Sequence, residues 1–73
     1  MYNGHKNYNH WNVSLWINND EGLYRFALRC IRYSMNRTEA VESFLERVSS
    51  PCTPDGVPYT KTSVRAAFSG LEA

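Results

Sequence analysis

The sequence predicts an all-α fold, a compact bundle of about four short helices with a Pro-rich loop before the last one. Apolar residues recur at three- and four-residue steps along the chain, as expected for helices that bury one face. Residues that can cap helices precede these stretches. All three prolines fall within residues 50–59, where they mark one long loop. Because 73 residues supply only one core, we expect residues 1–73 to form a single helical domain.

The first expected helix covers about residues 9–18, where the pattern is ambiguous. Val13, Leu15 and Ile17 alternate as in a strand, whereas Trp11 and Leu15 are four residues apart, as in a helix. A lone strand would leave its backbone groups unpaired, and the neighbouring stretch is clearly helical. We therefore predict a short helix here.

The second helix has the clearest pattern. It follows a turn at residues 18–22, where Asn19 or Asp20 can cap it and acidic side chains suit the positive end of its dipole. Its apolar positions are Leu23, Phe26, Ala27, Cys30, Ile31 and Ser34, widened by Tyr24 and Leu28. On the opposite side, Arg25, Arg29 and Arg32 follow one another at i, i+4 and i+7. This helix therefore presents a row of arginines.

A third helix begins near Asn36, which has the spacing of a capping box with Glu39, and Thr38 is the competing cap. Its buried residues should be Val41, Phe44, Leu45 and Val48. The stretch Ser49-Ser50-Pro51 should end it, because the residue before a proline disfavours helix.

The loop of residues 50–59 contains a Pro-Asp-Gly turn at 54–56 and is ordered if Val57 and Tyr59 pack inward. Thr60 or Thr62 can cap the last helix. Its apolar residues are Val64, Ala67, Phe68 and Leu71, with Gly70 as the stop.

Ten of the residues are aromatic, and much of the core's area should come from them. We expect Trp11 and Trp16 to be core anchors. The alternative is that some aromatic side chains stay exposed as contacts for a protein partner, because Tyr and Trp are enriched in binding hot spots. The candidates for this role are Tyr2, Tyr8, Trp11 and Trp16.

The net charge and the hydropathy of the chain argue against general DNA binders, DNA mimics and membrane proteins. Eight Lys and Arg against seven Asp and Glu give a net charge of +1, which is neither the basic balance of a general DNA binder nor the acidic balance of a DNA mimic. No apolar run approaches the ~18 residues of a membrane span, and the N-terminus has no secretory pattern. We expect a cytoplasmic protein that does not enter a membrane.

The chain is not expected to be an enzyme or to bind a cofactor or metal. It contains no Gly-rich phosphate loop, nucleophile elbow or paired-carboxylate motif. Its possible zinc ligands are His5, His10, Cys30 and Cys52. They are isolated, whereas structural zinc sites take ligands in close pairs. A disulfide between the two cysteines is geometrically possible, but two free thiols are expected in a reducing cytosol.

The best candidate for a binding surface is the arginine row of the second helix. Arginine pairs bidentately with carboxylates and phosphates, and an adjacent tyrosine can stack. The expected partner-binding residues are Arg25, Arg29, Arg32, Tyr33 and Tyr8. The alternative is a solvated helix face without a partner, whose arginines are free to form salt bridges with Glu39, Glu42 or Glu46 of the next helix.

Residues 7–24 resemble the N-terminal signature of a family of small proteins from phages, prophages and plasmids. That signature reads N-Y-x-x-W-N-V-x-L-W-[IL]-x-N-D-E-G-L-Y, and the resemblance fades after Tyr33. It implies a mobile-element origin and brings no activity with it.

Small mobile-element proteins without catalytic motifs commonly act by occupying a surface of a host machine, and inhibitors of CRISPR effector complexes are of this size. By this analogy, the resemblance implies an anti-CRISPR protein, a phage-encoded inhibitor that sterically blocks a bacterial protein or ribonucleoprotein complex in the host cytoplasm. The alternatives are a small nucleic-acid-binding regulator and a structural or assembly accessory of a phage particle.

Overall fold

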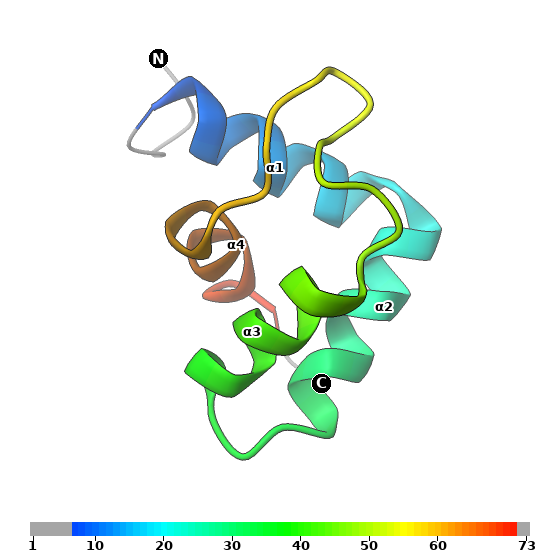
Figure 1. The fold of residues 1–73 in the computed structure, drawn as a ribbon, viewed down its shortest axis with the longest axis vertical. Coiled ribbons are helices and arrows are strands. Elements are labelled where there is room, and N and C mark those ends of the chain that lie inside the picture. The colour runs from blue at the N-terminus through cyan, green and yellow to red at the C-terminus, as the bar shows by residue number, and fades with distance from the viewer. Residues whose placement is uncertain (1–6, 72–73) are drawn as a thin grey trace.

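The computed structural model describes residues 7–71, which form four α-helices and no strand (Figure 1). The helices are α1 (Tyr8–Asn19), α2 (Glu21–Arg32), α3 (Arg37–Arg47) and α4 (Lys61–Phe68). Each packs mainly against two others, in a closed order from α1 through α2 and α3 to α4 and back to α1. The predicted bundle of four short helices is confirmed.

Each helix begins at a side chain that accepts a hydrogen bond from the N–H three residues later, which satisfies one of the unpaired donors of a helix start. The pairs are Asn7 with His10 (3.0 Å), Asp20 with Leu23 (2.9 Å), Asn36 with Glu39 (2.8 Å) and Thr60 with Ser63 (3.1 Å). The structure thus selects Asp20 over Asn19, Asn36 over Thr38 and Thr60 over Thr62.

Asp20 also ends α1, because its backbone N–H donates to the carbonyl of Trp16 at 2.9 Å. One residue therefore separates α1 from α2, which holds the two helices at a sharp angle (Figure 1). The ambiguous segment is helical: Val13 and Ile17, four residues apart, are buried, whereas Leu15 between them is exposed. The helical interpretation of this segment is confirmed.

The core centres on Phe44 of α3, whose ring contacts three other aromatic rings. The centroid distances are 5.1 Å to Phe26, 5.4 Å to Tyr59 and 5.5 Å to Phe68. The last two contacts are edge-to-face, which is a favoured geometry for aromatic pairs. Val57 is buried and Tyr59 packs on the core, as expected if the loop is ordered.

The prediction that the tryptophans anchor the core is wrong. Trp11 and Trp16 are only partly buried and do not belong to the core cluster. The indole of Trp16 has an N–H that needs an acceptor, and it finds one in the carboxylate of Asp55 at 2.9 Å. Its place is therefore at the boundary between α1 and the loop.

Hydrogen bonds among four residues hold the loop on α1. We call these residues the loop clamp: Asn12, Trp16, Thr53 and Asp55. The side-chain amide of Asn12 donates to the carboxylate of Asp55 at 2.8 Å, and the Thr53 hydroxyl donates to the side-chain oxygen of Asn12 at 2.8 Å. Asn12 and Thr53 are buried, so their polar groups need these partners. Within the loop, Gly56 has φ +86°, a left-handed conformation that suits glycine at this turn.

Candidate binding site

The arginine row of α2 points away from the core. Ala27 and Cys30 are buried on one side of the helix, which leaves the positions at i, i+4 and i+7 from Arg25 exposed on the other. The row and two neighbours line a hollow of about 370 Å³: Arg25, Arg29, Arg32, Leu28 and Tyr33. Four of the five predicted contact residues therefore lie together on one face.

Tyr8 does not lie on this face. It is the first residue of α1, and its ring packs against Trp11 with a centroid distance of 5.7 Å. Its hydroxyl accepts a hydrogen bond from the Asn12 amide at 3.4 Å. A partner contact at Tyr8 stays a prediction, and it belongs to a different surface from the arginine row.

The arginine row carries unbalanced positive charge. Within residues 7–71 the single salt bridge is between Arg25 and Glu21, at 2.7 Å, and both side chains are about three-quarters exposed. Such an exposed i,i+4 pair contributes only about 0.3–0.5 kcal/mol. The salt bridges to Glu39, Glu42 or Glu46 of the next helix are therefore not formed within the described residues, and a solvated helix face stays the alternative to a binding surface.

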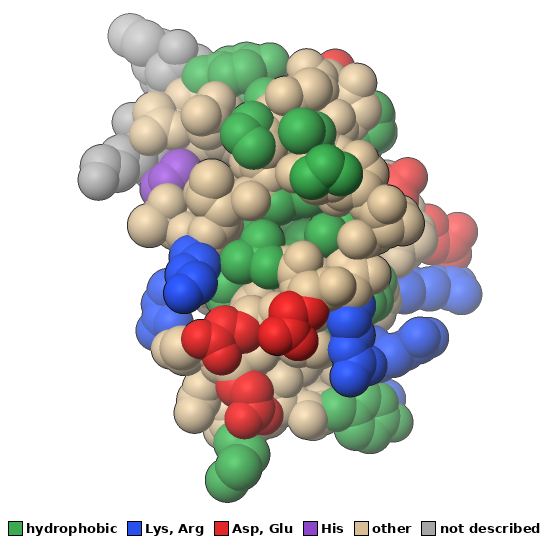
Figure 2. All heavy atoms as spheres, viewed as in Figure 1, with side chains coloured by type: hydrophobic (Ala, Val, Ile, Leu, Met, Phe, Trp, Pro, Cys, Tyr) green, Lys and Arg blue, Asp and Glu red, His purple; other side chains and the backbone are tan. Residues whose placement is uncertain are grey.

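Those acidic residues occupy another part of the surface. Figure 2 shows acidic side chains over the front of the molecule, where α3 lies, and basic side chains along the edge formed by α2. Glu39 has a local partner, since its carboxylate accepts a hydrogen bond from the N–H of Met35 at 2.9 Å. The two charged surfaces therefore do not neutralise each other.

A fourth arginine joins the row from the end of α3. Arg47 lines a second hollow of about 240 Å³, on the seam between α2 and α3, together with Phe26, Arg29 and Tyr33. Arg29 and Tyr33 line the first hollow as well, so the two hollows adjoin each other. The packing of α3 against α2 brings Arg47 to the arginine row.

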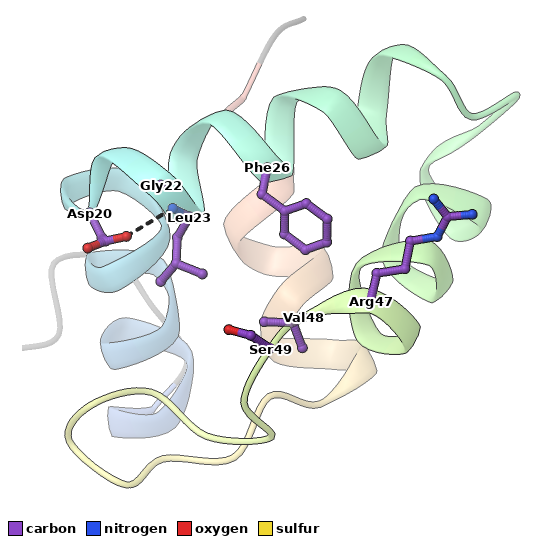
Figure 3. Close-up of a pocket in the computed structure, with 7 residues that line it drawn as sticks. All are labelled: Asp20, Gly22, Leu23, Phe26, Arg47, Val48 and Ser49. Atoms are coloured by element: carbon purple, nitrogen blue, oxygen red, sulfur yellow. Dashed lines mark hydrogen bonds between the residues drawn. The ribbon is translucent and has the colours of Figure 1, made fainter.

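A third hollow, of about 340 Å³, extends the seam toward the start of α2 (Figure 3). Its sides are apolar, with Leu23 and Phe26 from α2 opposite Val48, and Figure 3 shows Arg47 at one end and Asp20 at the other. Phe26 and Arg47 also line the second hollow. We call these two adjoining hollows, which extend along the seam from Asp20 to Tyr33, the seam groove.

Cys30 offers no activated thiolate. Burial raises the pKa of the Cys30 thiol, and a hydrogen bond with Ser43 and the charges of Arg47 and Arg29 only oppose that effect. A protonated, buried thiol is a poor nucleophile. Both cysteines are free in the structure, as expected.

The residues considered as metal ligands do not cluster within the part of the chain that the structure describes. No three His, Cys, Asp or Glu side chains within residues 7–71 are arranged to hold a metal ion, and His5 lies outside the described residues, as does Tyr2. Across the same residues no helix has the length and apolar character to span a bilayer.

Several residues of the N-terminal signature have structural roles. Asn7 and Asp20 cap helices, Asn12 and Trp16 form the loop clamp, and Val13 lies in the core. Asp20 was one of the two caps expected for the second helix, whereas the roles of Asn12 and Trp16 in the loop clamp were not recognised in the sequence, although a polar Asn12 within an apolar stretch was a signal for one of them. The signature therefore describes mainly how α1 is built, and it also includes three residues at the Asp20 end of the seam groove: Asp20, Gly22 and Leu23.

The model of a family of unknown function, DUF7249, matches residues 1–68. Comparisons with curated proteins and with solved structures gave no match. The family match covers all four helices and both sides of the seam groove.

Proposed function

We propose a function for this chain, which belongs to DUF7249, a family of unknown function. The proposed function is that of a mobile-element-encoded inhibitor of a bacterial defence complex, in the first place a CRISPR effector complex. The proposal has two parts. The binding surface is inferred from the arrangement of the arginines, and the class of partner rests on the analogy with small mobile-element proteins that block host machines.

The observation that carries the proposal is the gathering of Arg25, Arg29, Arg32 and Tyr33 around one hollow, with Arg47 beside it. Only Arg25 among them forms a salt bridge within residues 7–71. Arginine and tyrosine are enriched at binding hot spots, because both combine a large contact area with directed hydrogen bonds. An acidic surface on the partner would complement this face.

The mechanism would be steric. A standard protein interface buries about 800 Å² on each partner. That area is about one-sixth of the chain's 4836 Å² surface, and the molecule measures 33 × 23 × 20 Å. A body of this size, held by one face, can cover a nucleic-acid entry site or a nuclease-recruitment site without any chemistry of its own.

A nucleic-acid-binding regulator is the second candidate, favoured by the same gathering of four arginines. Salt dependence separates the two functions. Four phosphate contacts would give a slope of log affinity against log salt of about −4, and binding would fall steeply between about 50 and 200 mM salt. An inhibitor of a protein surface needs no affinity for free DNA or RNA.

The test is inhibition of target-DNA cleavage by a panel of purified CRISPR effector complexes. The wild-type protein should block at least one of them. The triple variant with Arg25, Arg29 and Arg32 changed to alanine should lose the inhibition, whereas the control with Lys61 and Arg65 of α4 changed to alanine should keep it.

Three results would contradict the proposal. A triple variant that is folded and fully inhibitory would remove the arginine face from the mechanism. Failure to inhibit every complex, together with steep salt-dependent DNA or RNA binding, would favour the regulator. Failure to inhibit with large assemblies in size-exclusion chromatography would favour a phage-particle accessory.

A further inference from the structure

The seam groove reaches beyond the arginine face and differs in chemistry along its length. At the end near Tyr33 it has Arg29 and Arg47. In the middle its walls are the side chains of Phe26 and Val48, which Figure 3 shows facing the same space. At the far end lies the carboxylate of Asp20, whose Oδ2 accepts the hydrogen bond of the Leu23 N–H.

We propose that the seam groove binds an acidic segment of the partner protein, with one apolar side chain seated between Leu23, Phe26 and Val48 and neighbouring carboxylates on Arg29 and Arg47. This inference rests on the proposed function, since it names the part of the partner that the inhibitor would hold. A short peptide segment is of the right scale for a groove between two helices of about 12 residues each.

The occupant is an acidic peptide because of the charges at the basic end. Arg29 and Arg47 come from different helices and have no salt bridge within the described residues. Guanidinium groups bind carboxylates bidentately, with shorter and stronger hydrogen bonds than neutral pairs. A basic segment would be repelled here, and a neutral one would leave both charges unanswered.

The apolar middle distinguishes a peptide from a nucleic acid. Phe26 is only partly buried although its ring packs on Phe44, so one side of it remains open to the groove. A leucine or aromatic side chain would cover that surface and gain the free energy of removing it from water. A phosphate backbone has no equivalent group and would use the arginines alone.

Asp20 fixes the direction of the segment. Its carboxylate would repel acidic residues at the far end, so the acidic residues of the segment should fall on the Arg47 side of the apolar residue. The expected sequence pattern is one apolar residue flanked on one side by two or more Asp or Glu residues, with neutral or basic residues on the other side.

The experiment is selection from a random 12-residue peptide display library on the full-length protein, followed by fluorescence anisotropy with synthetic copies of the selected peptides. Three variants locate the site. Arg47→Glu reverses the charge at the basic end, and Ser49→Tyr fills the apolar part from an exposed position on its rim. Lys61→Glu makes the same charge change as Arg47→Glu, on the exposed start of α4.

The selected peptides should show the apolar and acidic pattern. Arg47→Glu and Ser49→Tyr should each weaken their binding by about tenfold or more, while Lys61→Glu leaves it within about twofold. Thermal melting of each variant separates loss of binding from loss of folding, and an unfolded Ser49→Tyr would be replaced by Ser49→Leu.

The inference would be overturned by a selection without enriched peptides, by enriched peptides that are not acidic, or by binding that Ser49→Tyr leaves intact. Oligo-dT binding equal in wild type and Ser49→Tyr, with no peptide binding, would assign the arginines to nucleic acid. These failures differ from failure of the proposed function: inhibition of an effector complex that needs the arginine row but tolerates Ser49→Tyr would refute the groove alone.

Discussion

Replacement of Asn12 by alanine should lower the free energy of unfolding strongly, although Asn12 is a polar residue. Asn12 is 1% exposed on α1, and its amide both donates to Asp55 and accepts from Thr53. Thr53 is itself 4% exposed, so in the variant its hydroxyl would keep the hydrogen bond from the Val57 N–H but would lose the acceptor for its own proton, with little access to water. Asp55 is exposed and would exchange the lost hydrogen bond for water.

The magnitude follows from the buried hydroxyl. A buried donor that loses its acceptor costs about 1–3 kcal/mol, so we expect the free energy of unfolding to fall by about 2 kcal/mol. A core of this size supplies only about 3–5 kcal/mol, and each kcal/mol moves Tm by roughly 4–8 °C in a domain of this length. Tm should therefore drop by about 8–16 °C.

The assay is thermal and urea unfolding followed by far-UV circular dichroism, with tryptophan emission as a local probe of Trp16 in the loop clamp. The matched control is Asn9→Ala, which removes an exposed asparagine from the same helix and should change Tm little. A drop in Tm for Asn12→Ala no larger than that of the control would refute the role of the clamp.

Three further predictions follow from the caps, the charges and the thiols. Asn12 and Trp16 donate hydrogen bonds to the Asp55 carboxylate and lower the pKa of Asp55. The contribution of Asp55 to stability is therefore complete above about pH 4 and is lost as the pH falls through the lowered pKa. In urea titrations, the stability difference between wild type and Asp55→Asn should shrink over that pH range. Asn36→Ala should cost about 0.5–2 kcal/mol in urea unfolding and Asn36→Gly only a few tenths, and equal costs would contradict the cap. A thiol reagent should modify Cys52 in the folded protein and Cys30 only on unfolding, whereas a disulfide would block both.

The helices and their caps were predictable because each depends on residues close in the chain. The spacing of Asn36 and Glu39 indicates a helix start wherever the segment is placed, and the structure confirms it. One detail differs, since Glu39 accepts from the N–H of Met35 instead of that of Asn36. Local patterns of this kind also predicted the second helix and its arginine row.

The loop clamp and the seam groove were not predictable, because they join residues far apart in the sequence. Trp16 and Asp55 are separated by 39 residues, and neither alone indicates the other. Arg47 reaches the arginine row only through the packing of α3 against α2. The tryptophans were misplaced for the same reason: their area favours the core, but the acceptor for the Trp16 N–H lies at the surface.

The closed ring of helices has a consequence for synthesis on the ribosome. The most extensive helix–helix contact joins α1 to α4, the first and last described helices to be made. Until α4 emerges, Val13 and Ile17 of α1 have no complete surface to pack on, although α2 and α3 can already pair. We therefore expect the nascent chain to remain incompletely folded, and sensitive to proteases, until α4 has left the exit tunnel.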